Sequence, residues 1–304
     1  MTRWFKKKLP LIIVYLCKRS KNISNGYLDI HSTLDLDMTH SFSLLTLNCF
    51  GLWLPNTRRR LRALAKELEQ CSYQVVCLQE IQLHQYRTLL VEGCASYSYP
   101  VFEPYVHCPK GGLLTLSRLP ITNSFFQPYE ERGLLYTPML LDRLFFKGML
   151  ITKLTSANLP MVIINTHLLA NFAGDWERRG MYARLEEKQL RQLAETVRSQ
   201  PLDSIVIVVG DFNIPRGGGL YEDFLAHSGL KDLLAGDTRP TLRLPPGTPS
   251  RFALPIDYVL VRIPEKHSFT VDCDLCFTGK YRINNRQRGY LSDHKGIEVR
   301  ITWN

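Results

Sequence analysis

Residues 204–215 read SIVIVVGDFNIP and carry the clearest structural signal in the chain. Residues 205–209 are an unbroken run of Ile and Val, which is typical of a β-strand covered on both faces. The run ends at Gly210, and the polar side chains of Asp211 and Asn213 follow directly. The stretch therefore predicts a buried strand that delivers a carboxylate and an amide to the edge of a sheet.

The same kind of apolar run, bounded by Gly, Pro or Asn, recurs along the chain from about residue 42. Seven more strands are predicted at Leu44–Cys49, Val75–Gln79, Leu113–Ser117, Met149–Leu154, Met161–Thr166, Ile256–Val261 and Ile297–Thr302. Helices are predicted over residues 61–68 and 190–197, where apolar residues follow the i, i+3, i+4, i+7 spacing, and a shorter one within residues 221–234. Strands with interspersed helices predict one domain with a layered α/β or α+β fold.

The composition is that of a globular protein. The chain has 304 residues, of which 45% are hydrophobic and 22% are charged, and this excludes a fibrous, collagen-like or wholly disordered protein. The formal net charge is +10, but residues 1–21 hold seven basic residues and no acidic one. The remainder is nearly balanced, and so it gives only weak support for nucleic-acid binding through phosphate neutralisation.

The first 40 residues are predicted to be a leader, separate from a globular domain over residues 41–304. Two basic clusters flank an apolar run from Leu9 to Cys17, about half of the roughly 20 residues that span a bilayer. Residues 1–21 fit a peripheral anchor on an anionic membrane surface. A secretory signal, a disordered extension and a start at Met38 remain open. A cytoplasmic or membrane-associated location is favoured over secretion, since no small-residue cleavage site follows the run.

The cysteines predict no structural zinc site. Cys49 and Cys77 fall inside apolar strand-like runs and are expected to be buried. Cys273 and Cys276 form one CxxC pair, but no second pair of Cys or His completes a zinc set. In a strand these two cysteines would also face opposite sides of the sheet.

Polar residues lie at or next to the ends of six of the predicted strands. They are Asn48, Gln79-Glu80, Asn165-Thr166-His167, Asp211-Phe212-Asn213, Asp257 and Ser292-Asp293-His294. One such residue at a strand end is commonly a cap or a solvated side chain. Six such groups at six strand ends are not expected by chance. The ends of adjacent strands lie together at one edge of a sheet, which we call a rim, and functional residues are commonly placed there. The sequence therefore predicts one site built from all six groups.

The residue types in this set indicate the chemistry. Carboxylates and amides supply oxygen ligands, which suit Mg²⁺, with Mn²⁺ as the alternative. Two histidines can move protons near neutral pH. The sequence contains neither HExxH, GxSxG nor GxxxxGK[ST], the motifs of zinc proteases, serine hydrolases and P-loop proteins. The set thus predicts metal-assisted attack of water on a phosphate ester.

The six groups, in this order, resemble the motifs of the endonuclease/exonuclease/phosphatase superfamily. The resemblance covers roughly residues 42–304, nearly everything except the leader. It implies a four-layered α/β sandwich, in which two packed β-sheets lie between outer helices. It also implies that residues 41–304 are the catalytic domain, and we expect a monomer.

The resemblance implies a metal site on one side of the rim. Glu80 is similar to the principal Mg²⁺ ligand of the family. Asn48 would lie beside it and hold the metal-bound water or the phosphate. Asp293 would be a carboxylate that completes the metal side.

The resemblance also implies the residues that carry the reaction. His294 is similar to the general base that activates water, oriented by Asp257. Asp211 would position the nucleophile or help to deprotonate it. Asn213 would donate a hydrogen bond to a phosphate oxygen, and His167 would contact the phosphate from the opposite side and stabilise developing charge.

Local features favour one branch of the superfamily. Lys147-Gly148 and the segment that begins at Asn165 are similar to neutral-sphingomyelinase-like members, and the nearly neutral domain suits a lipid headgroup or another small phosphodiester. The alternative is a nuclease on DNA or RNA, or a phosphatase, because two basic clusters are present: Arg58–Arg60 with Arg62, and Arg282, Arg286 and Arg288. An inactive binding module is disfavoured, since every motif of the site is intact.

Overall fold

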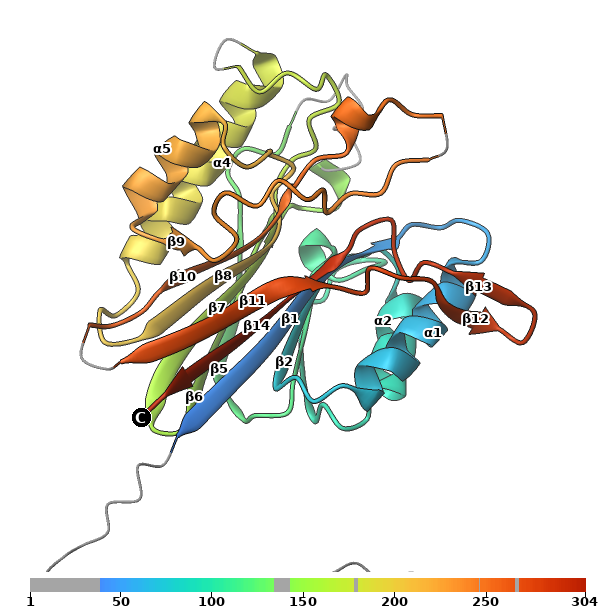
Figure 1. Cartoon of the computed structure of the whole chain (residues 1–304), viewed down its shortest axis with the longest axis horizontal. Coiled ribbons are helices and arrows are strands. Elements are labelled where there is room, and N and C mark those ends of the chain that lie inside the picture. Colours follow the sequence, from blue (N-terminus) through green and yellow to red (C-terminus); the bar gives the residue numbers. More distant parts are fainter. Residues whose placement is uncertain (1–38, 134–142, 178–179, 246, 266–267) are drawn as a thin grey trace, which may run out of the picture. The chain divides into compact units, whose positions relative to one another are not determined.

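Two six-stranded β-sheets pack face to face, and helices cover their outer faces (Figure 1). The computed structural model describes residues 39–133, 143–177, 180–245, 247–265 and 268–304. The predicted membrane anchor of residues 1–21, and all but two residues of the predicted leader, lie outside the described residues. None of the described helices is long and apolar enough to cross a bilayer.

The first sheet has the strand order β11-β14-β1-β2-β4-β3. Its strands are β1 (His40–Gly51), β2 (Val75–Ile81), β3 (Tyr99–Val101), β4 (Leu114–Ser117), β11 (Phe269–Cys276) and β14 (Gly296–Trp303). Strands β1 and β2 are parallel, and their other neighbours are antiparallel. On its outer face lie the helices α1 (Thr57–Gln70) and α2 (His84–Gly93). The hairpin of β12 (Tyr281–Asn284) and β13 (Gln287–Gly289) lies beside α1.

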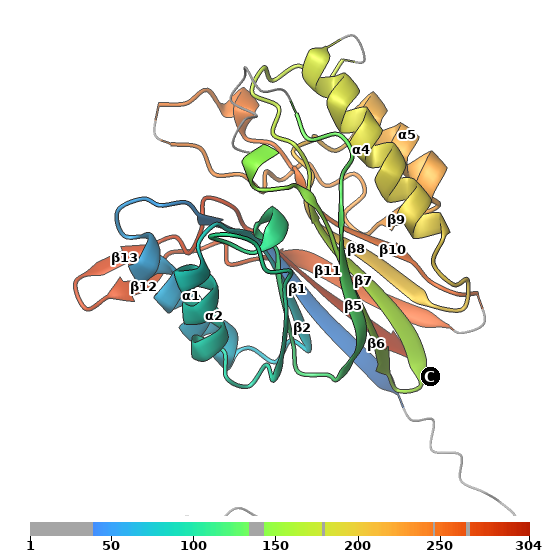
Figure 2. The ribbon, with the colours of Figure 1, turned by 180° about the vertical axis from the view of Figure 1, so that it is seen from behind.

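The second sheet has the order β5-β6-β7-β8-β10-β9. Its strands are β5 (Ile121–Pro128), β6 (Gly148–Ser156), β7 (Leu159–His167), β8 (Ile205–Asp211), β9 (Lys231–Asp232) and β10 (Asp257–Arg262). Here β7 and β8 form the parallel pair. The helices α4 (Met181–Arg198) and α5 (Gly219–Ser228) cover its outer face, as Figure 2 shows from behind. Two short 3₁₀ helices, Lys110–Gly112 and Ser250–Phe252, lie in connecting loops.

Three apolar clusters separate the four layers. Side chains such as Leu44, Ile163 and Ile207 fill the space between the two sheets. Leu61 and its helical neighbours pack α1 against the first sheet, and Leu193 packs α4 against the second. Strands covered on both faces need apolar residues at every position, which explains the unbroken runs of Val and Ile. The predicted four-layered α/β sandwich is confirmed. The eight strands and three helices that the sequence predicted are all present among the elements of the structure.

The predicted burial of Cys49 and Cys77 and the predicted facing of Cys273 and Cys276 are confirmed. Cys49 and Cys77 are fully buried. Cys273 and Cys276 lie in strand β11 and face opposite sides, since Cys273 packs between the sheets and Cys276 packs on the helix side. The two sulfur atoms therefore cannot serve one metal ion from this strand.

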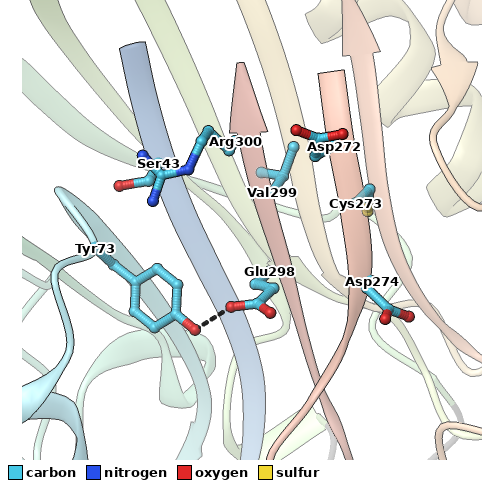
Figure 3. A pocket seen from close by; sticks show the side chains of 8 residues that line it. All are labelled: Ser43, Tyr73, Asp272, Cys273, Asp274, Glu298, Val299 and Arg300. Carbon is cyan, nitrogen blue, oxygen red and sulfur yellow. Dashed lines mark hydrogen bonds between the residues drawn. The ribbon is translucent and has the colours of Figure 1, made fainter. Parts of the chain in front are cut away.

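The outer face of the first sheet is hollowed where β11, β14 and β1 extend beyond the helices. The hollow has a volume of about 410 Å³ and a polar lining that includes Ser43, Asp272, Asp274 and Arg300 (Figure 3). The Tyr73 hydroxyl donates a hydrogen bond to Glu298 across it. None of the residues predicted for the site lines this hollow.

Candidate active site

The strand directions bring the six polar groups to one edge of the sandwich, which we call the site rim. The parallel pairs β1/β2 and β7/β8 end there, and the antiparallel strands β10 and β14 begin there. In the sheet register Asp211 is paired with His167 on one side and with Asp257 on the other. The rim therefore unites residues that are up to 246 positions apart, from Asn48 to His294.

Three side chains of the kinds that ligate cations converge where the two sheets meet. One ligand atom each of Glu80, His167 and Asp211 lies within 4.8 Å of the others. The Asn48 amide nitrogen donates to Glu80 Oε1 at 3.0 Å and to Asp211 Oδ2 at 2.9 Å. Asn48 thus ties a carboxylate of the first sheet to a carboxylate of the second.

A histidine lies between two carboxylates beside this group. His294 Nδ1 is 2.8 Å from Asp257 Oδ2, and because a carboxylate accepts, Nδ1 carries the proton. The other ring nitrogen, Nε2, is 3.7 Å from Asp211 Oδ2. Burial alone would lower the pKa of His294, but the charges of Asp257 and Asp211 raise it well above its usual range.

Burial shifts the other titratable groups of the rim toward their neutral forms. It raises the pKa of Asp211 to about 7 and raises the pKa of Glu80, although the Lys147 ammonium opposes the shift at Glu80. It lowers the pKa of His167 well below the usual range, and the positive charges of Lys147 and His294 add to this. Carboxylates held together away from water are stabilised by a cation, which removes the cost of their charge.

The residues present fit a divalent metal ion. Glu80 Oε2 is buried and has no hydrogen-bond partner among the described residues. A buried carboxylate oxygen without a partner is costly unless a cation or water binds it. The carboxylates of Glu80 and Asp211 supply the oxygen ligands that Mg²⁺ and Mn²⁺ prefer.

Binding of such an ion is expected to raise the melting temperature. An ion at one hundred times its Kd stabilises the native state by about 2.7 kcal/mol, which is a rise of several degrees for a domain of this size. Glu80→Gln should abolish the rise, whereas Asp272→Asn, which removes a carboxylate from the hollow of Figure 3, should retain it. Thermal unfolding with Mg²⁺ and with a chelator checks this, and an equal rise in Glu80→Gln would contradict it.

Two predicted site residues make contacts other than those expected. The Asn213 amide donates to Leu168 O at 3.1 Å, and its backbone N–H donates to Asp211 Oδ1 at 2.9 Å. Asp293 Oδ1 accepts from Ser292 Oγ at 3.2 Å. The Asp293 carboxylate is near enough to raise the pKa of Glu80 but is not part of the 4.8 Å group.

The backbone is strained at two site residues, Glu80 and Asn213, and two glycines allow neighbouring strands to approach closely beside the site. Glu80 and Asn213 have φ of 58° and 56°, in the left-handed region that side chains disfavour. A Cβ on Gly210 would lie 1.8 Å from the Thr166 carbonyl oxygen, and one on Gly51 would lie 2.1 Å from that of Glu80. Only glycine therefore lets the backbones beside Asp211 and Glu80 approach so closely.

Two half-buried arginines donate hydrogen bonds to the segment that carries Asp293 and His294, and neither was predicted as a site residue. The Arg60 guanidinium donates to the carbonyls of Cys49 and Phe50, each at 2.5 Å, and to the carbonyl of Leu291 at 2.6 Å. Arg60 therefore differs from the exposed Arg58 and Arg59, because its guanidinium is engaged with backbone carbonyls of the rim. Its spacing of four residues before the buried Leu64 was the available signal.

Arg243 is the second of these arginines. Its guanidinium donates to the carbonyls of Ser292, His294 and Phe277, and its backbone N–H donates to Asp293 O. It lies in an irregular loop, where no periodicity marks a buried face. Lys147, which the sequence marked only as part of the Lys-Gly pair of one branch of the superfamily, is buried, and its ammonium donates to Leu168 O at 3.2 Å.

The comparisons with known proteins agree with this geometry. Residues 45–294 match the model of the Endonuclease/Exonuclease/phosphatase family. A candidate neutral sphingomyelinase of Drosophila melanogaster is 24% identical over 198 residues, and an inositol phosphosphingolipids phospholipase C of Saccharomyces cerevisiae is 29% identical over 226 residues. The alignments cover 64% and 65% of this chain but only 44% and 46% of the relatives, so the chain spans less than half of their length.

Solved structures share the fold. TDP2 of D. rerio in complex with a single-stranded DNA product is 21% identical, with a TM-score of 0.65 over 87% of this chain and 99% of the other. A beta toxin variant of Staphylococcus aureus with bound magnesium ions is 18% identical, with a TM-score of 0.59 over 85% and 99%. With the family match over most of the chain and the site rim in place, the chain belongs to the Endonuclease/Exonuclease/phosphatase family, whose members are phosphoric ester hydrolases.

Proposed function

We propose that this chain is a magnesium-dependent phosphodiester hydrolase that acts on a phospholipid headgroup or another small phosphodiester. The observation that carries the proposal is the meeting of Glu80, Asp211 and two histidines from both sheets at one rim. Phosphoryl transfer needs alignment and neutralisation of charge more than covalent help. The rim offers side chains that can align the substrate and side chains that can neutralise its charge.

Glu80 is the proposed principal ligand of Mg²⁺, or of Mn²⁺, with Asp211 and His167 facing the same point. When bound, the cation supplies positive charge that neutralises the phosphate oxygens. Asn48 is proposed to align the two carboxylates, since its amide nitrogen donates to both of them. Asp293 is proposed to add negative charge on the metal side.

His294 is the proposed general base. Asp257 binds the proton on Nδ1, so the lone pair of Nε2 is free to accept a proton from water. Asp211, 3.7 Å from Nε2, is proposed to position that water. His167 and Asn213, which flank Asp211, are proposed to contact the phosphate and to stabilise its developing charge.

Two observations support a lipid over a nucleic acid. Both curated relatives are named for sphingolipid substrates, and the body of the chain is nearly neutral. The second candidate is a nuclease, which the exposed residues Arg282, Arg286 and Arg288 of the β12–β13 hairpin favour. The proposed setting is the cytoplasm or a membrane surface, to which residues 1–21 would add affinity.

Hydrolysis assays with Mg²⁺ on four substrates test the proposal. They are sphingomyelin in mixed micelles, the soluble ester bis(4-nitrophenyl) phosphate, single-stranded DNA and double-stranded DNA. We expect the lipid and the soluble ester to be hydrolysed, and a chelator to abolish both reactions. Cleavage of DNA alone would favour the nuclease, and no hydrolysis of any phosphodiester would refute the proposal.

A further inference from the structure

Large apolar side chains are exposed mainly at the site rim. Among the described residues, eleven large hydrophobic side chains are exposed. Eight of them lie in segments that follow β1, β3 or β7 or precede β6, β10 or β14, all at the rim end of the sandwich. They include Trp53, Leu54, Val106, Phe172, Phe252 and Tyr290. A soluble protein seldom gathers exposed apolar groups around one opening unless something covers them.

The most exposed of these residues lies close to Asn48 in the sequence. Trp53 is 86% exposed and Leu54 is 44% exposed, in the loop between Gly51, the last residue of β1, and helix α1. Figure 1 shows this loop on the same side of the sandwich as the β12–β13 hairpin. An indole this exposed makes no contribution to the core, so its role lies outside the fold.

Positive charge surrounds the exposed tryptophan. Trp53 and Leu54 share a groove of about 500 Å³ with Arg58, Arg59 and Arg62 of the first turns of α1. All three arginines are exposed, and none forms an ion pair with a carboxylate of the described residues. The basic β12–β13 hairpin lies beside α1 and continues this charge along the rim.

The combination of side chains identifies the partner. Arginine beside tryptophan suits either an anionic lipid surface or a single-stranded nucleic acid. Exposed aliphatic side chains decide between them, because Leu54 and Val106, the latter 80% exposed, offer no face on which a base could stack. They gain free energy only by leaving water for an apolar phase, such as the upper acyl region of a bilayer.

We propose that the site rim is a docking face for an anionic lipid bilayer, with Trp53 and Leu54 inserted and Arg58, Arg59 and Arg62 at the headgroups. The docking face rests on the proposed function, since it would present a bilayer-held phosphodiester to Asn48 and Glu80. None of its residues belongs to the predicted anchor in residues 1–21.

Tryptophan fluorescence tests the insertion directly in the full chain. Trp4→Phe removes the leader's tryptophan, and of the others Trp303 is buried and Trp176 donates its N–H to Asn213 O. Vesicles of phosphatidylcholine and phosphatidylserine with brominated acyl chains should quench Trp53 and shift its emission to the blue. Trp53→Phe in the same background should lose most of the quenching. Equal quenching with and without Trp53 would overturn the docking face.

Kinetics separate docking from chemistry. Trp53→Ala/Leu54→Ala is expected to lower hydrolysis of vesicle lipid by about tenfold or more, with an unchanged rate on soluble bis(4-nitrophenyl) phosphate. The matched control is Leu202→Ala, because Leu202 is 81% exposed in the turn between α4 and β8, away from the rim. That variant should hydrolyse vesicle lipid like the unsubstituted protein. Equal losses in both variants, or none in either, would contradict the docking face.

Two further outcomes distinguish this inference from the proposed function. Quenching of Trp53 by vesicles without hydrolysis of any phosphodiester would uphold the docking face and refute the hydrolase. Loss of single-stranded DNA binding in Arg58→Gln/Arg59→Gln/Arg62→Gln, with vesicle binding unchanged, would assign the groove to nucleic acid and refute the docking face.

Discussion

His294→Ala is expected to lower kcat by about 10³-fold, within the range of general-base catalysis, and to change KM much less. The imidazole acts only when water loses its proton, so its removal affects the transition state more than substrate binding. Steady-state kinetics on the soluble ester measure both constants. An unchanged kcat would remove His294 from the role of base.

The pH profile gives an independent test of the same residue. The base must be neutral, and the charges of Asp257 and Asp211 raise the pKa of His294 well above its usual range. Activity should therefore fall as pH falls through this raised pKa, at higher pH than the value of about 6–7 that the ordinary pKa of histidine suggests. Asp257→Asn removes one of the two anions, so the acid limb should move to lower pH while kcat also falls. A limb that stays in place would contradict the pairing of Asp257 with the base.

Glu80→Gln is expected to lower activity by about 10²–10³-fold. An amide binds a divalent cation far less well than a carboxylate does, yet the Gln oxygen can still accept from Asn48, so the fold is expected to survive. Activity measured over a series of Mg²⁺ concentrations should require more metal in the variant. The matched control is Asp272→Asn, which removes an exposed carboxylate remote from the rim and should behave as the unsubstituted protein does.

Full activity of the unsubstituted protein in excess chelator would exclude a metal-dependent reaction. An active Glu80→Gln protein with an unchanged metal requirement would instead show that the principal ligand lies elsewhere, and Asp211 would be the next residue to replace.

The buried strands could be predicted from the sequence, whereas the edge strands could not. Strands such as β8 are covered on both faces and therefore read as continuous apolar runs. Strand β11 alternates between Thr270, Asp272 and Asp274 on the outside and apolar residues on the inside, and β5 is an edge strand with Thr122 and Asn123 exposed. Such half-covered segments carry too few apolar residues to stand out. Helix α2, with only Tyr86 and Leu90 buried, has the same weakness.

The convergence of the six polar groups on one rim could be predicted from the sequence, because strand ends at one edge of a sheet lie close together. The direction of each side chain could not. Asn48 was expected beside the metal, and nothing in the sequence could indicate that its amide nitrogen donates to Glu80 and Asp211 at once. Arg243 illustrates the same limit, since its hydrogen bonds reach three carbonyls that are distant in sequence.

The place of β14 between β1 and β11 has a consequence for how the domain folds. Residues 40–46 of β1 pair with residues 297–303 of β14. Within the domain, β1 therefore gains this neighbour only after nearly all of the intervening strands have been synthesised. Closing so long a loop costs entropy before any contact is gained, which makes folding slow. Until β14 arrives, β1 exposes a row of unpaired backbone groups on that side. Refolding is therefore expected to compete with edge-to-edge aggregation through β1, most strongly at high protein concentration.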